Sequence, residues 1–385
     1  MALNLGANAI GKLYLGSTQI NKAYLGTNVL FSSGSNPASL PSTRLFDGLY
    51  QRPELLFSSL APLTPLVDDG TAKVALAIDT SQGVNVIADG TARTFTGLGA
   101  DGLASFGAWT VETGSGISGS NGTATLTGAG DGAQVSAGIT TGSTKIDVTV
   151  SGLSGEILIK DGSTTIATID TNGTTESFAR IGADLRVEAS GTTTATVTIT
   201  AKPVSGIHGI QTTANDQPSY DWDNFTLDLP GATQHLTYPN ASLGDDVTAM
   251  LLVKIPASVD AGMLVSASEK YSLYFLEDST RTELSYQSGA PTYSLNGVAK
   301  TWTRDQAHAQ ICTDEWVIVG IHGIDCTDSE WRTLILTGRG EDTSYEIEGL
   351  IKASFVAQAP SLADRNQAGN YLASLIPDLE YTDET

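Results

Sequence analysis

Short strand-like runs, separated by glycine-containing turns, make up the middle of the chain. In TATVTIT (194–200) small and β-branched residues alternate, so one face is expected to pack and the other to be solvated. Between residues 101 and 204 such runs follow one another at intervals of about 8–12 residues. The turns between them include SGLSG, KDGS and TNGT. Evenly spaced short strands with such turns are typical of antiparallel sandwiches and jelly rolls, so an all-β fold is predicted. The predicted strands are Thr123–Thr127, Lys145–Val150, Glu156–Lys160, Thr164–Ile169, Asp184–Glu188 and Thr194–Thr200.

A second region, residues 205–385, has similar runs with more aromatic residues and predicts a larger sandwich. One helix is expected near its end, because Ser361 is a good N-cap with Asp364 three residues later, and Pro377 would stop the helix. The acidic segment 378–385 is expected to be frayed. The predicted strands here are Phe225–Leu229, Thr248–Ile255, Met263–Ser266, Tyr271–Leu276, Glu283–Tyr286, Trp316–Ile321, Trp331–Leu336 and Leu350–Val356.

The charge and hydropathy of the chain exclude several kinds of partner. Its 385 residues carry a formal net charge of −22, so the cationic face that nucleic-acid binding needs is missing. The longest apolar runs, such as Trp316–Ile321, are far shorter than the about 20 residues of a membrane-spanning helix. The first residues also lack the basic start and apolar run of a secretory signal. We therefore expect no nucleic-acid partner, no membrane insertion and assembly in the cytoplasm.

The first thirty residues repeat one phrase three times, as MALNLGANAI, GKLYLGSTQI and NKAYLGTNVL. Ten residues accommodate one short strand and one tight turn, with glycine available where the backbone needs a positive φ. Units of this size cannot bury a core alone, so residues 1–31 are expected to dock onto a partner. The expected attachment residues are Lys12, Tyr14, Leu15, Gly16, Lys22, Tyr24, Leu25 and Gly26.

Among the residue types that can carry out catalysis, only the carboxylates are plentiful in this chain. No nucleophile-elbow or zinc-protease motif occurs, and two GxGxxG matches lack a following helix, so no enzyme is predicted. We interpret the best acid pairs as solvated turn residues, with a Ca²⁺ site as the alternative and catalysis as a remote one. Those acids are Asp221, Asp223, Asp245 and Asp246. No other cofactor is expected.

The aromatic residues Tyr286, Tyr293, Trp302 and Trp331 are candidates for stacking on a sugar, with core packing as the alternative for each. Trp302 lies in the polar sequence KTWTR, so we expect it to be exposed and name Tyr293 and Trp302 as candidate glycan-binding residues.

The two cysteines, Cys312 and Cys326, match no zinc pattern. They are predicted to be buried thiols on neighbouring strands, with a disulfide as the alternative.

Three segments resemble parts of tailed-bacteriophage virion proteins. The sequence KLYLGSTQINKAYLGTNVLF (12–31) resembles the short YLG-type segments that attach an appendage to the particle, and VALAIDTSQG (74–83) is similar to a phrase of phage tail proteins. The module that begins at Phe106–Val111 resembles phage carbohydrate-binding-like jelly rolls. Residues 205–385 resemble concanavalin and laminin-G-like lectin sandwiches, on Asp223–Leu229, Glu315–Ile321 with Trp331–Arg339, and the closing GLIKASFVAQAPSLADRNQAGNYLASL.

The resemblance implies a division of the chain and a function. Residues 1–31 would attach to other virion proteins, 32–42 would be a linker, 43–100 a connecting β region, 101–204 a carbohydrate-binding-like sandwich and 205–385 a lectin-like sandwich. It implies a tail fibre or spike, commonly homotrimeric, that recognises a host-surface glycan. A head fibre or capsid decoration protein with a structural role is the alternative, and a glycan-degrading enzyme a remote one.

Overall fold

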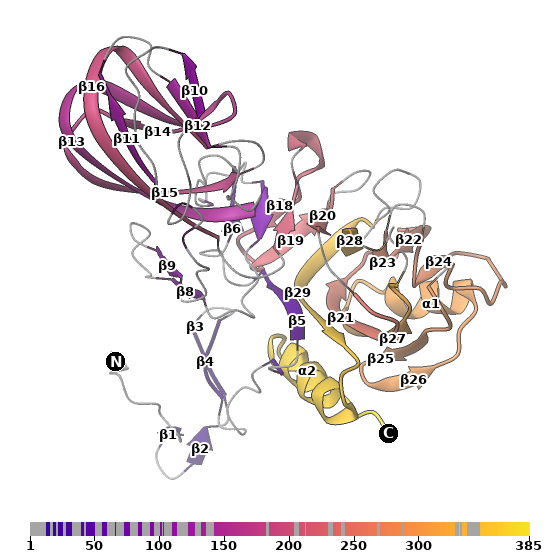
Figure 1. Ribbon diagram of the computed structural model, residues 1–385. Coiled ribbons are helices and arrows are strands. Elements are labelled where there is room, and N and C mark those ends of the chain that lie inside the picture. The colour runs from indigo at the N-terminus through magenta and orange to yellow at the C-terminus, as the bar shows by residue number, and fades with distance from the viewer. Residues whose placement is uncertain are drawn as a thin grey trace. The chain divides into compact units, whose positions relative to one another are not determined.

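A computed structural model shows the chain as two compact units, Met1–Arg52 with Asn215–Thr385, and Pro53–Ala214 (Figure 1). The structure describes residues 142–181, 185–203, 208–229, 234–239, 243–327, 331–336 and 347–385, apart from residues 212, 268, 269, 287 and 332. It also describes shorter pieces before residue 142, namely 13–15, 18–20, 22–25, 28–32, 40–41, 44–50, 56–59, 66, 73–77, 84–86, 93–95, 101, 103, 110–113, 122–127 and 132–135.

The unit Pro53–Ala214 is built around two long antiparallel strands, β13 (Gly142–Asp161) and β16 (Leu185–Pro203). The strand order is β10-β12-β16-β13-β14, with β11 also on β16 and β15 also on β13 (Figure 1). The shorter strands of this sheet are β10 (Thr110–Thr113), β11 (Thr123–Leu126), β12 (Gly132–Val135), β14 (Thr164–Ile169) and β15 (Gly173–Ile181).

Four strands predicted in this unit are merged into two. Lys145–Val150 and Glu156–Lys160 are both part of β13. The described part of Asp184–Glu188, from Leu185 on, and Thr194–Thr200 both fall on β16. The expected turn SGLSG is a bend inside β13, where the pairing register shifts and Gly152 and Gly155 have φ of 67° and 102°. Glycine adopts such angles without the steric cost of a Cβ, so the strand bends and continues.

The expected alternation of packed and solvated residues is confirmed in this unit. Every second residue of Ile146–Val150 and of Ala195–Ile199 is buried, and these side chains belong to one core cluster. Thr193 holds the bend together, because its hydroxyl donates to the carbonyl oxygens of Glu156 and Ser190 at 2.9 and 2.6 Å. The remaining strands of the unit are β6 (Leu56–Phe57), β7 (Leu76–Ala77), β8 (Val84–Val86), β9 (Arg93–Phe95) and β17 (Gly209–Ile210).

The other unit contains a large antiparallel sheet in the order β18-β19-β29-β21-β27-β25-β26. Strand β5 also pairs with β29, so residues 44–49, which were expected in a connecting region, belong to this sheet. The strands are β5 (Arg44–Leu49), β18 (Ser219–Asp221), β19 (Thr226–Leu229), β21 (Val247–Lys254), β25 (Thr292–Leu295), β26 (Val298–Lys300), β27 (Trp316–Ile324) and β29 (Gly349–Gln358).

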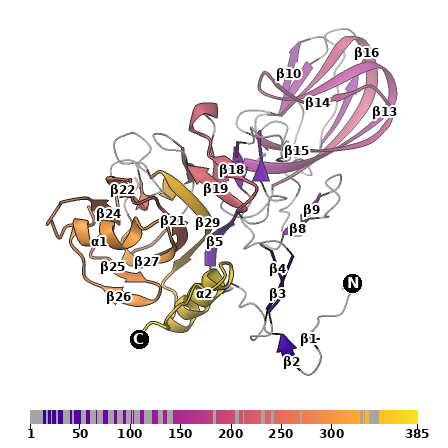
Figure 2. The ribbon, with the colours of Figure 1, turned by 180° about the vertical axis from the view of Figure 1, so that it is seen from behind.

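Helix α2 (Leu362–Ser374) covers one face of this sheet, against β21, β27 and β29 (Figure 2). Its buried face joins one side of the central strands in a single core cluster that includes Met250, Leu252, Phe355, Ala368 and Leu372. The predicted N-cap is confirmed, since the Ser361 hydroxyl accepts from the Asp364 amide at 3.1 Å and the Asp364 carboxylate accepts from the Ser361 amide at 3.3 Å.

A second helix, α1 (Arg304–Ile311), was not predicted. Its mean hydropathy is low and Trp302 precedes it in a polar sequence, so the sequence shows no apolar stripe from which the helix could be predicted.

Several small strands complete the fold. They are β20 (Leu236–Pro239), β22 (Ala261–Met263), β23 (Val265–Ser266), β24 (Tyr274–Leu276) and β28 (Thr333–Leu336), with the short 3₁₀ helix Ala214–Asp216. Predicted strand Glu283–Tyr286 is reduced to one bridge, Tyr271↔Tyr286.

The second and third copies of the N-terminal repeat each form a β-hairpin rather than a single strand, and the first copy lies outside the described residues. Strand β1 (Leu13–Leu15) pairs with β2 (Thr18–Ile20), and β3 (Lys22–Leu25) pairs with β4 (Asn28–Ser32). The pairs Leu15↔Thr18 and Leu25↔Asn28 leave two residues for each connection. Among the described strands each hairpin pairs only with itself. The all-β prediction is therefore confirmed, with both antiparallel sheets and hairpins.

Candidate functional site

A pocket of about 590 Å³ lies beside the first turn of helix α1. Three short elements form its walls: strand β24 with its partner β22, the loop 277–281 that follows β24, and the start of α1. The lining residues are Met263, Tyr271, Tyr274, Leu276, Glu277, Asp278, Ser279, Arg281 and Arg304. Pockets of this size accommodate small ligands.

Backbone hydrogen bonds fix these walls against each other. The first amides of α1 donate to the loop, from Arg304 to the Arg281 carbonyl at 2.9 Å and from Asp305 to the Ser279 carbonyl at 3.0 Å. The loop turns at Asp278, whose φ is 57°, a conformation that aspartate tolerates better than most residues. A capping box between Thr303 and Gln306 completes the helix start. The pocket is therefore preformed by the backbone rather than by side chains alone.

Arg304 supplies a buried cation to this pocket. Its side chain is 7% exposed, and its Nε donates to the Glu283 carbonyl at 2.8 Å. The guanidinium carbon lies 4.4 Å from the centre of the Tyr274 ring, a cation–π contact. The only other hydrogen bond that it makes within the described part of the chain is a long one of 3.4 Å, from Nη2 to the Tyr271 hydroxyl. Its Nη1 has no partner among the described residues, and no described carboxylate forms an ion pair with it.

Tyrosine rings form the apolar part of the same site. Tyr271 is half-buried, contacts Tyr274 edge-on at 5.6 Å between ring centres, and stacks on Tyr286 at 5.9 Å. Tyr286 is 49% exposed. Of the four aromatic residues considered for sugar stacking, Tyr286 is thus the one that presents a large exposed surface. Together the tyrosines, the guanidinium and the acidic loop offer stacking, donor and acceptor groups within one pocket.

The expected exposure of Trp302 is wrong. Its side chain is 4% exposed and stacks on Tyr293 at 6.2 Å, so the polar sequence around it does not place it at the surface. Tyr293 is half-buried, and its hydroxyl donates to the Ser272 carbonyl at 2.9 Å. Burial raises the pKa of Tyr293 to about 12. Trp331 is fully buried as well. Neither Trp302 nor Trp331 offers an open ring face to a sugar.

Of the four acids proposed for calcium, Asp221 ends strand β18 and Asp223, Asp245 and Asp246 lie in turns or bends. Asp221 accepts hydrogen bonds from the amides of Asp223 and Asn224 at 2.9 and 3.1 Å, while Asp223, Asp245 and Asp246 are exposed. Within the described residues no three His, Cys, Asp or Glu side chains are grouped to hold a metal ion. The calcium site stays a prediction, and the turn hydrogen bonds account for the position of Asp221.

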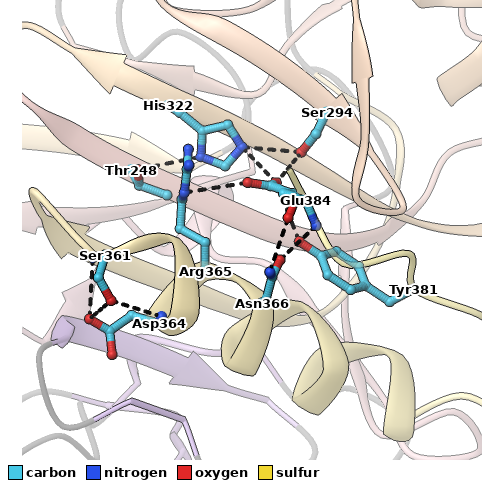
Figure 3. Close-up of polar contacts among 9 residues, drawn as sticks. All are labelled: Thr248, Ser294, His322, Ser361, Asp364, Arg365, Asn366, Tyr381 and Glu384. Carbon is cyan, nitrogen blue, oxygen red and sulfur yellow. Dashed lines mark hydrogen bonds and ion pairs between the residues drawn. The ribbon is translucent and has the colours of Figure 1, made fainter.

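A second cluster of polar side chains surrounds Glu384 (Figure 3). Its carboxylate accepts from the Ser294 hydroxyl at 2.8 Å and forms ion pairs with His322 at 3.0 Å and Arg365 at 3.3 Å. The Glu384 side chain is 9% exposed. The expectation that segment 378–385 is frayed is therefore wrong, because Glu384 near its end is paired inside the fold, although Asp378, Glu380 and Asp383 are exposed. We call Ser294, His322, Arg365 and Glu384 the C-terminal clamp.

Neighbouring contacts hold the same segment in place. Asn366 bonds the backbone of Glu384 twice, with its Oδ1 accepting from the amide at 2.7 Å and its Nδ2 donating to the carbonyl at 3.2 Å. The ring of Tyr381 lies where a Cβ on Gly369 would be, 2.1 Å away, so this helix position has room only for glycine. Figure 3 shows these groups converging from helix α2 and the C-terminal segment.

The clamp contains serine, histidine and glutamate, but not in the geometry of a nucleophilic triad. A triad places the serine and the carboxylate on opposite ring nitrogens of the histidine. Here Ser294 and Glu384 both lie at Nε2 of His322, at 3.1 and 3.0 Å, and Nδ1 faces the Thr248 hydroxyl at 3.4 Å. Ser294 and His322 are also buried. The arrangement stabilises a charge, and we interpret it as structural.

The electrostatics of Glu384 support this interpretation. Burial by itself would raise the pKa of the carboxyl group. The hydrogen bond and charge of His322, the Ser294 hydroxyl and the Arg365 guanidinium outweigh that effect, so the pKa of Glu384 is lowered. The carboxylate is held in its ionised form.

The expected attachment residues fall on the two N-terminal hairpins. Tyr14 and Leu15 lie on β1, and Lys22, Tyr24 and Leu25 lie on β3. Lys12, Gly16 and Gly26 lie outside the described residues.

The cysteines are buried and free, which confirms the thiol interpretation over a disulfide. They do not lie on neighbouring strands, since Cys312 caps α1 and Cys326 follows β27.

Comparisons with known proteins leave the family open. No protein-family model, curated protein or solved structure is significantly similar to the chain. Neither helix of the described part of the chain has the length and apolar composition that crossing a membrane requires.

Proposed function

We propose that the chain is an appendage protein of a tailed phage or phage-like particle, attached through its N-terminal hairpins and displaying its β units for recognition of a host-surface glycan. The observation that carries this proposal is the pairing of the repeats. Hairpins β1-β2 and β3-β4 each pair only with themselves among the described strands. A two-stranded hairpin is marginally stable alone, so such segments gain stability by adding to a partner.

The sequence of the hairpins supports the same role. Each hairpin carries one Tyr-Leu-Gly copy of the repeat, and the residues 1–31 contain lysines but no acid, whereas the whole chain has a net charge of −22. A cationic segment on an acidic chain favours docking to an acidic surface of another protein. Resemblance of the same residues to virion attachment segments points to a particle as the partner.

Deletion of residues 1–35 tests the attachment. We expect the shortened chain to fold, because the sheets of both units are formed by later residues, and to be missing from purified particles. A point variant, Tyr14→Ala with Tyr24→Ala, is expected to weaken incorporation, and Tyr14→Phe with Tyr24→Phe serves as its matched control. Normal incorporation of the deleted chain would defeat the proposal.

The position on the particle distinguishes the receptor role from the structural alternative. Gold-labelled antibody against residues 205–385 is applied to purified particles and viewed by electron microscopy. Label at the tail tip or fibres is the expected result and supports host recognition. Label spread over the capsid instead indicates a head fibre or decoration protein.

A further inference from the structure

We propose that the pocket beside helix α1 binds an acidic saccharide, with the sugar carboxylate paired to Arg304. The inference rests on the glycan recognition proposed above and adds the site and the class of sugar. Arg304 is a buried cation in the pocket wall and has no ion-pair partner among the described residues.

A buried cation without a counter-charge is costly, and the usual solution is a carboxylate that forms charge-assisted hydrogen bonds. The Arg304 Nε is used by the Glu283 carbonyl, and the cation–π contact with Tyr274 fixes the plane of the guanidinium. Its Nη1 has no hydrogen bond to a described residue, and Nη2 has only the 3.4 Å contact with Tyr271. The outer edge of the fork therefore remains available for both oxygens of one ligand carboxylate.

The rest of the lining fits a sugar ring rather than a phosphate group. Glu277, Asp278 and Ser279 also line the pocket, and their oxygens can accept hydrogen bonds from hydroxyl groups. The charges of these two carboxylates cancel those of Arg304 and Arg281, so the lining carries no net charge and disfavours a doubly charged phosphate more than a singly charged carboxylate. The half-buried ring of Tyr271 gives an apolar face on which a pyranose stacks. A monocarboxylated sugar uses all three features.

Ligand-observed saturation-transfer NMR on the full chain tests the assignment. The probes are the methyl glycosides of glucuronic and galacturonic acid and N-acetylneuraminic acid, each up to about 10 mM, the range of weak single-sugar binding. The neutral methyl glucoside and methyl galactoside are the matched controls. At least one acidic sugar is expected to bind, and its neutral counterpart to bind more weakly.

Variants locate the binding. Arg304→Gln should weaken the acidic sugar roughly 10- to 100-fold, the loss expected for one charged hydrogen-bonded contact. Lys300→Gln removes the same charge from β26, outside the lining, and should leave binding unchanged. Where Arg304→Gln does not fold, Ser279→Trp fills the pocket from its rim and is expected to abolish binding.

Three results would overturn the assignment. They are no binding of any acidic probe, equal binding of acidic and neutral sugars, or full binding by the folded Arg304→Gln or Ser279→Trp protein. Incorporation into particles is measured separately with the N-terminal deletion. A chain that enters particles at the tail but binds no acidic sugar loses the pocket assignment alone, and the proposed function stands.

Discussion

Glu384 forms an ion pair with His322, its carboxylate oxygen 3.0 Å from the ring Nε2, although 62 residues separate them in the chain. The pair links the C-terminal segment to strand β27 in the middle of the large sheet. Because Ser294 donates to the same oxygen, the interaction also includes strand β25. An ionised carboxylate only accepts hydrogen bonds, so the His322 Nε2 is the donor to Glu384 in this arrangement.

Substitution of Glu384 by glutamine should destabilise the unit that contains it. The glutamine keeps the size of the side chain but removes the charge that His322 and Arg365 face. Leaving buried partners without their counter-charge is expected to lower the free energy of unfolding by about 1–3 kcal/mol. Urea denaturation followed by tryptophan fluorescence measures the change.

Glu380→Gln is the matched control for that experiment. Glu380 lies in the same segment and is exposed, with no hydrogen bond or ion pair to a described residue, so its substitution should be neutral within about 0.5 kcal/mol. Equal stabilities of the Glu384→Gln and Glu380→Gln proteins would show that the clamp contributes nothing.

Acid should release the clamp. The folded-state pKa of Glu384 lies below its ordinary value of 4.5, so the ionised form is favoured by folding. The stabilisation is therefore complete above the unfolded pKa and is lost as the pH falls through the folded pKa. We expect the difference in Tm between wild type and Glu384→Gln to shrink as the pH falls below about 4.5. A difference that stays the same down to about pH 3 would contradict this assignment.

The sequence predicted the sheets well because their signal is local. Alternation along Ala195–Ile199 and the capping residues Ser361 and Asp364 are each decided within a few residues, and the structure confirms both. Each long strand was predicted as two shorter ones, with the break at Gly152 and Gly155 in β13 and at Gly191 in β16. A glycine at positive φ occurs both in a turn that ends a strand and in a bend within one, so the sequence does not distinguish the two.

The pocket and the clamp depend on contacts that local sequence does not encode. Glu384 was interpreted as part of a solvated acidic tail, since its partners His322 and Ser294 are 62 and 90 residues away in the chain. Trp302 was expected at the surface because its neighbours in the chain are polar. Its burial depends instead on Tyr293, whose ring stacks on it and which local sequence does not reveal as a neighbour. Of the aromatic residues considered for stacking, Tyr286 is the exposed one, and it stacks on Tyr271 in the pocket lining.

Gly369 should not tolerate a methyl group. A Cβ at this position would lie 2.1 Å from the Tyr381 ring, so Gly369→Ala is expected to displace the ring and to lower the free energy of unfolding by about 1–3 kcal/mol. Helix propensity alone would have the opposite sign, with alanine favoured by up to about 1 kcal/mol. The sign of the measured change in thermal or urea unfolding therefore decides between the two effects.

A double-mutant cycle isolates the contact between Gly369 and Tyr381. In a Tyr381→Ala background the space is empty, so Gly369→Ala should become neutral or slightly stabilising. The same loss in both backgrounds would mean that the ring of Tyr381 does not limit this position.

Both cysteines should be inert while the protein is folded. Burial raises the pKa of Cys312 and of Cys326 to about 12, and the charge of Asp325 adds to the effect at Cys326. At pH 8 the thiolate fraction would then be roughly 10⁻⁴, against about a quarter for a free thiol. We expect almost no reaction with a thiol reagent such as DTNB under native conditions and release of two equivalents in guanidinium chloride. Rapid native reaction of either thiol would contradict the burial, and no reaction in denaturant would mean that the two are joined as a disulfide.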